Sequence, residues 1–142
     1  MPSDPVLVDT GPLVALFDPS DAAHEGCVAT MESLGRRDLV TSLAVVTEAM
    51  WLLAPLPRAQ TALASFLEAE ALRIAAFGAR DVARAVGWMS RYANVPMDFA
   101  DATLVTLAEG LQTRSVFTLD LRDFGIYRIG RRAFRVLTSA HE

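Results

Sequence analysis

Short apolar segments alternate with longer segments of helical pattern along this chain, and this alternation constrains the fold most strongly. The segments that predict strands cover residues 5–8, 39–41, 72–77, 115–119 and 134–137. The segments that predict helices cover residues 13–17, 19–34, 43–54, 58–70, 79–93 and 97–111. Residues 121–132 show neither pattern and are expected to form an irregular loop. Strands separated by helices predict a short parallel sheet with helices on both faces, which is a three-layer α/β/α sandwich.

Length and composition limit the organisation of the chain and the chemistry open to it. With 142 residues, 52% of them hydrophobic, we expect a single domain over residues 1–142. All 13 basic residues are arginine, which excludes Walker-type nucleotide binding and Schiff-base chemistry, since both need lysine. The N-terminal sequence lacks the pattern of a signal peptide, and no run of 18 apolar residues occurs. We therefore expect a cytoplasmic protein with no membrane association.

Acidic residues stand where the predicted strands and helices meet. Asp9 ends the first strand and Asp120 ends the fourth. Because the carboxyl ends of parallel strands meet at one edge of the sheet, these two side chains are expected to converge. Glu48 lies in an apolar helical run and is expected to be at least partly buried. Asp98 and Asp101 are three residues apart at the start of a helix and therefore share one of its faces.

Each of these acids also has a local explanation. Asp98 is best explained as a helix cap, Asp9 and Asp120 can each be a cap after a strand, and an arginine or solvent can satisfy Glu48. Several carboxylates gathered at one edge would nevertheless repel each other. A hard divalent cation relieves that repulsion, so the pattern predicts a Mg²⁺ or Mn²⁺ site, which can support hydrolysis of a phosphate ester.

Four segments resemble the motifs of PIN-domain ribonucleases, specifically the VapC-type toxins of bacterial toxin–antitoxin pairs. They are VLVDTGPLVALFD (6–18), TSLAVVTEAMWLL (41–53), MDFADATLVTLAEG (97–110) and SVFTLDLRDFGIYR (115–128). The resemblance implies a metal-dependent endoribonuclease that leaves a 5′-phosphate and a 3′-hydroxyl. It also implies a homodimer and a small antitoxin partner that blocks the site. The implied catalytic metal ligands are Asp9, Glu48, Asp101 and Asp120, with Asp98 as an auxiliary ligand.

The charged and hydroxyl side chains around these acids suggest contacts to RNA. Without the five acids, the formal charge of −4 would become +1, so the acidity is concentrated in the proposed site. Thr10 and Thr118 can orient water, substrate or a neighbouring carboxylate. Arg122 is expected to contact substrate phosphate, and Phe124 and Tyr127 could offer ring faces to unpaired bases. Residues 122–135 contain four further arginines, for which a role in RNA binding stays open, namely Arg128, Arg131, Arg132 and Arg135.

Two other functions are compatible with the same residues. A metal-dependent phosphomonoesterase could use an acidic site, although the missing lysine and the lack of an Asp-x-Asp after the first strand disfavour it. A module that binds RNA or an antitoxin with negligible turnover is the second alternative, and the complete set of acids disfavours it.

Overall fold

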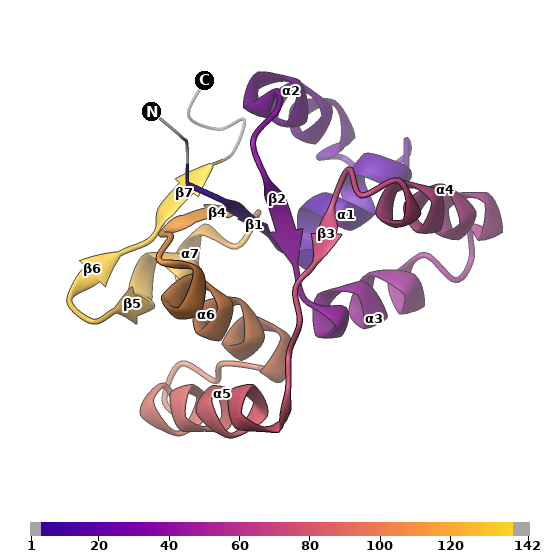
Figure 1. Cartoon of the computed structure of the whole chain (residues 1–142). Helices are drawn as coiled ribbons and strands as arrows, with labels where there is room; N and C mark the ends of the chain where they lie inside the picture. The colour runs from indigo at the N-terminus through magenta and orange to yellow at the C-terminus, as the bar shows by residue number, and fades with distance from the viewer. Residues whose placement is uncertain (1–3, 138–142) are drawn as a thin grey trace.

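A sheet of five parallel strands forms the centre of the computed structural model, which describes residues 4–137 (Figure 1). The strands are β1 (Val6–Val8), β2 (Leu39–Thr41), β3 (Arg73–Ile74), β4 (Ser115–Phe117) and β7 (Arg135–Leu137). Their order across the sheet is β3-β2-β1-β4-β7, and every pair of neighbours is parallel. The apolar strand β1 lies in the middle, where its three side chains are fully buried.

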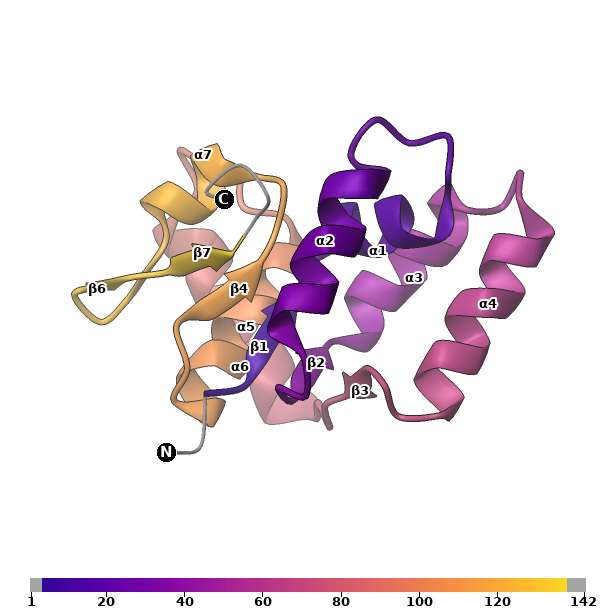
Figure 2. The same cartoon turned by 90° about the horizontal axis from the view of Figure 1, so that it is seen from above.

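Helices cover both faces of this sheet, as the alternating pattern predicts. They are α1 (Thr10–Phe17), α2 (His24–Leu34), α3 (Leu43–Leu52), α4 (Pro57–Glu68), α5 (Ala79–Arg91), α6 (Phe99–Leu111) and α7 (Leu121–Ile126). Helix α2 lies on one side of the sheet, and α5 and α6 lie on the other (Figure 1). Seen from above, α1 lies beside α2 and next to α3 (Figure 2). The three-layer α/β prediction is therefore confirmed, and the core is one apolar cluster in which β1, β2 and β4 meet the inward faces of the surrounding helices.

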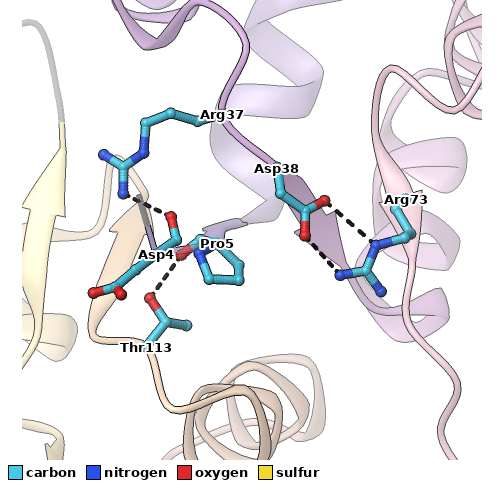
Figure 3. Close-up of polar contacts among 6 residues, drawn as sticks. All are labelled: Asp4, Pro5, Arg37, Asp38, Arg73 and Thr113. Carbon is cyan, nitrogen blue, oxygen red and sulfur yellow. Dashed lines mark hydrogen bonds and ion pairs between the residues drawn. The ribbon is translucent and has the colours of Figure 1, made fainter. Parts of the chain in front are cut away.

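Polar contacts tie the strands together at the edge where they begin. Thr113, just before β4, donates through Oγ1 to the carbonyl oxygen of Pro5, just before β1, at 2.6 Å (Figure 3). Asp38, just before β2, forms an ion pair with Arg73 of β3, with 2.8 Å between Oδ2 and Nη2. These contacts hold together the edge of the sheet at which the strands begin. The opposite edge, at which the strands end, is where the acidic residues lie.

Two predicted helices begin elsewhere than expected, and hydrogen bonds from backbone N–H groups to aspartate side chains explain both differences. Helix α1 begins at Thr10, three residues earlier than predicted, because the Asp9 carboxylate accepts from the Thr10 backbone N–H. Helix α2 begins at His24, five residues later than predicted. There, the carboxylates of Asp18 and Asp21 bond backbone N–H groups two residues ahead, which favours turns over helix.

The prediction of an irregular loop over 121–132 is wrong. The segment forms helix α7 and most of a hairpin between β5 (Arg128–Ile129) and β6 (Arg132–Ala133). The helix begins because Asp120 accepts from the Asp123 backbone N–H and so caps it. The hairpin turns at Gly130, whose φ of 62° is favoured in glycine.

No helix within residues 4–137 combines the length and the apolar character needed to cross a bilayer. Residues 1–3 and 138–142 of the predicted domain lie outside the described residues. The remaining strands and helices match their predicted segments, with ends shifted by a few residues and with β3 shortened to two residues.

Candidate active site

A cavity of about 510 Å³ opens beyond the carboxyl ends of β1 and β4. Seven of its lining residues are acidic, namely Asp9, Asp21, Glu48, Asp98, Asp101, Asp120 and Asp123. None of its lining residues within 4–137 is basic. All five acids singled out by the sequence therefore line a single cavity, and the structure adds Asp21 and Asp123 to them.

Asp9 is the most deeply buried of these acids. It follows β1, and its Oδ1 caps α1 by accepting from the Thr10 backbone N–H at 2.8 Å. Its Oδ2 accepts from the Thr118 hydroxyl at 2.7 Å. Burial raises the pKa of Asp9 from 3.8 to about 6, against the two hydrogen bonds, which lower it. Asp9 is thus held rigidly, although burial makes its negative charge costly.

Helix α6 brings two further carboxylates to the cavity. Asp98 is its N-cap and accepts from the Asp101 backbone N–H at 2.8 Å, as its position in the sequence predicts. Asp101 is half-buried and accepts from the Tyr127 hydroxyl at 2.9 Å. Burial, followed by the charges of Asp9 and Asp98, raises the pKa of Asp101 from 3.8 to about 8. The repulsion expected from the sequence is therefore present at Asp101.

Two further carboxylates, those of Asp120 and Asp123, lie at the start of helix α7. Asp120 is its N-cap, and Asp123 lies in its first turn. One oxygen from each of these two residues and one from Asp101 all lie within 4.8 Å of one another. The pKa of Asp123 is raised, first by burial and then by Asp120, while the charge of Arg122 opposes the change.

These carboxylates fit a hard divalent cation. All the groups that gather are oxygen donors, which Mg²⁺ and Mn²⁺ prefer. Both ion pairs between side chains in residues 4–137 lie outside the cavity, so no arginine of the described chain neutralises the acids there through an ion pair. A cation would offset the charge repulsion that raises the pKa of Asp101.

Comparisons with known proteins agree with this architecture. A family model described as the PIN domain matches residues 6–131. The chain belongs to the PIN-domain family. It is 32% identical to Ribonuclease VapC26 of Mycobacterium tuberculosis over 135 residues, which are 93% of this chain and 99% of that protein. This similarity makes the chain a PIN domain of the VapC type.

A solved structure has a fold similar to that of this chain. The crystal structure of Mycobacterium tuberculosis VapC20, named a sarcin–ricin loop cleaving toxin, matches with a TM-score of 0.74. The match is 23% identical and covers 82% of this chain and 91% of that one.

Glu48 of this PIN domain is exposed, so the prediction of partial burial is wrong. Helix α3 buries Val45, Val46 and Ala49, while its own apolar Trp51 faces solvent with 77% of its surface exposed. The apolar residues that flank Glu48 in the sequence therefore do not bury its side chain in the fold. The carboxylate still lines the cavity, where its charge adds to the rise in the pKa of Asp9.

The two threonines lie beside the acids. The buried Thr118 hydroxyl donates to the Asp9 carboxylate and accepts from the Asp120 backbone N–H at 2.9 Å, so it connects that carboxylate to the backbone of Asp120. Thr10 lines the cavity, and its buried hydroxyl has no hydrogen-bond partner among the described residues.

The aromatic and arginine residues after Asp120 differ from expectation. Phe124 and Tyr127 are fully buried, so neither offers a ring face to a base. Arg128 donates to carbonyl oxygens at the end of α7, which gives it a structural role. Arg135 pairs with Ser115 at the start of β4, so it lies toward the edge of the sheet opposite to the cavity. Arg122 is exposed beside Asp123.

The sequence analysis missed Asp21, Asp123 and the contact of Tyr127 with Asp101. Asp123 follows Asp120 at the same spacing as Asp101 follows Asp98, and that repeated Asp-x-x-Asp was the available signal. The signal was lost because 121–132 was predicted to be a loop. Tyr127 had no comparable signal, since only the folded structure places its hydroxyl on Asp101.

Proposed function

We propose that this PIN domain, as a single domain over residues 1–142, is a divalent-metal-dependent endoribonuclease that hydrolyses RNA phosphodiester bonds. The observation that carries the proposal is the cavity in which acidic residues from five parts of the chain meet. Buried carboxylates with raised pKa values, in a cleft that has no basic lining residue within 4–137, are typical of functional sites. The similarity to a protein named as a ribonuclease supports nuclease chemistry at this site.

Asp9, Glu48, Asp101 and Asp120 would hold Mg²⁺ or Mn²⁺, with Asp98 as an auxiliary ligand and capping residue. When bound, the cation makes water more acidic and stabilises negative charge on the scissile phosphate. Thr118 holds Asp9 in place through its hydrogen bond, and Thr10 offers a hydroxyl to substrate or water. Arg122, exposed beside the cavity rim at Asp123, would contact a substrate phosphate. The products would carry a 5′-phosphate and a 3′-hydroxyl.

We further propose that the chain is the toxin of a type II toxin–antitoxin pair and forms a homodimer in the cytoplasm, where its RNA substrate lies. The VapC-type relatives support the antitoxin partner. Exposed apolar side chains on α3, above all Leu43 and Trp51, support a protein contact. A second hollow lies between Trp51 and Phe99 and shares Glu48 and Asp98 with the acidic cavity. A protein bound there would lie against the candidate site.

Cleavage of total RNA by purified, antitoxin-free protein tests the proposed activity. The reactions contain Mg²⁺, Mn²⁺ or EDTA, and they compare the unchanged protein with Asp101→Asn. Asp38→Asn is the matched control, because Asp38 is an exposed carboxylate paired with Arg73 and does not line the cavity. We expect the unchanged protein and Asp38→Asn to produce discrete RNA fragments, and to do so only when Mg²⁺ or Mn²⁺ is present.

Other outcomes would favour the alternatives. Folded protein that cleaves no RNA with either metal would favour a binding module. Hydrolysis of a chromogenic phosphomonoester without RNA cleavage would favour a phosphomonoesterase.

A further inference from the structure

Tyr127 connects the aromatic core to the acidic cavity. Its side chain is fully buried, and its hydroxyl donates to Oδ2 of Asp101 at 2.9 Å. We propose that Tyr127 is a positioning residue that fixes the Asp101 carboxylate relative to Asp120 and Asp123, so that the three can bind one divalent cation. This inference rests on the proposed metal-dependent function and adds a residue that does not line the cavity itself.

Helix α7 explains why one tyrosine can control this geometry. Asp120 is the N-cap of the helix, Asp123 lies in its first turn, and Tyr127 is its C-cap. The helix therefore carries two carboxylates of the cluster at one end and, at its other end, the donor that holds the third. Asp101 belongs to α6, so the Tyr127 hydrogen bond joins the two helices that must stay in register for the three oxygens to remain within 4.8 Å.

The tyrosine ring is braced and cannot easily turn away from Asp101. It packs edge-to-face against Tyr92, with ring centroids 5.2 Å apart, and against Phe124, with centroids 5.1 Å apart. Phe124 packs in turn on Phe134, and Tyr92 stacks on Trp88. Such aromatic contacts stabilise a defined ring orientation. The hydroxyl is consequently held at Asp101 by the core rather than by a mobile side chain.

The hydrogen bond also makes the two oxygens of the Asp101 carboxylate unequal. Oδ2 is occupied by the Tyr127 hydroxyl, whereas no donor within residues 4–137 forms a hydrogen bond to Oδ1. A carboxylate that accepts a fixed hydrogen bond on one oxygen presents the other in a defined direction. In metal sites, loss of a partner that orients a ligand typically weakens metal binding about 10–100-fold.

The test compares two variants that each lose one phenol hydroxyl from the same aromatic cluster. Tyr127→Phe keeps the ring and removes the donor to Asp101. Tyr92→Phe is the matched control, because the Tyr92 hydroxyl accepts from the Arg128 backbone N–H and does not touch an acid of the cavity. Mn²⁺ affinity is measured by electron paramagnetic resonance of the free ion, and thermal unfolding and RNA cleavage are measured on the same preparations.

We expect Tyr127→Phe to weaken Mn²⁺ binding about 10-fold or more and to lower kcat with little change in KM, while Tyr92→Phe stays within about twofold of the unchanged protein. Unchanged Mn²⁺ affinity in Tyr127→Phe would overturn the proposal. Loss of the folded state in that variant would overturn it too, because the hydroxyl would then be needed for folding rather than for positioning.

The two proposals can fail separately. Weakened Mn²⁺ binding in Tyr127→Phe, in a protein that cleaves no RNA, would support the positioning role and contradict the nuclease. RNA cleavage together with equal Mn²⁺ affinity in all three proteins would support the nuclease and contradict the positioning role. Absence of Mn²⁺ binding by the unchanged protein would contradict both.

Discussion

Replacing Asp101 with Asn should stabilise the metal-free protein while it removes activity. The pKa of Asp101 rises from 3.8 to about 8 on folding, so the folded state holds a proton that the unfolded state has released at neutral pH. The contribution of the protonated Asp101 to the free energy of unfolding is thus fully present below pH 3.8, and it is lost as the pH rises toward 8. The corresponding cost of folding is about 4 kcal/mol at pH 7 and about 0.5 kcal/mol at pH 4.

Asparagine avoids this cost because it is neutral at every pH, and its amide oxygen can still accept from Tyr127. Asp101 is half-buried, so solvent reduces the penalty, and we expect a gain of about 2–4 kcal/mol at pH 7. The assay is urea unfolding in EDTA at pH 7 and pH 4, where the gain should nearly vanish. Asp38→Asn should instead lower stability by less than about 1 kcal/mol, because it only breaks an exposed ion pair. A destabilised Asp101→Asn at pH 7, or an equal effect at both pH values, would refute this reasoning.

Three further predictions concern metal, hydrogen bonding and assembly. Adding Mg²⁺ or Mn²⁺ should raise the Tm of the unchanged protein but not that of Asp120→Asn, as measured by differential scanning fluorimetry. Equal Tm shifts in the two proteins would show that the cation binds elsewhere. Thr118→Val should lower the free energy of unfolding in urea by about 1–3 kcal/mol, because it removes the buried donor to Asp9. An unchanged urea midpoint would show that this hydrogen bond adds no net stability. Trp51→Glu should convert the proposed homodimer into a monomer, as measured by light scattering, because Trp51 is 77% exposed on α3. A dimer that persists in this variant would exclude this face of α3 as the dimer contact.

The main features of the fold follow from local sequence patterns. The first three predicted strands are short, largely apolar and each followed by a helix signal, and that combination predicts a parallel sheet before any contact is known. Asp9 and Asp120 could be placed at one edge because both follow strands that are neighbours in the same sheet. The local capping roles of Asp9, Asp98 and Asp120 were also predictable, and the structure shows that caps and cavity acids are the same residues. A capping role therefore does not argue against a functional one.

The features that could not be predicted depend on contacts between distant segments. The exposure of Glu48 depends on which face of α3 packs inward, and the helix is apolar nearly all round, so its sequence does not select a face. Helix α7 has only six residues, too few for a periodic pattern, and it is stabilised by the Asp120 cap and by burial of Phe124. Tyr127 meets Asp101 across 26 positions of sequence, a pairing that no local pattern encodes.

The most direct test of the central claim measures Mn²⁺ binding and RNA cleavage in one titration. If the acidic cavity holds the cation that hydrolysis requires, the two curves should rise over the same Mn²⁺ concentrations for the unchanged protein. Both should be lost together in Asp101→Asn and in Asp120→Asn and kept in Asp38→Asn. RNA cleavage that persists in EDTA, or that survives in the two cavity variants, would contradict the account.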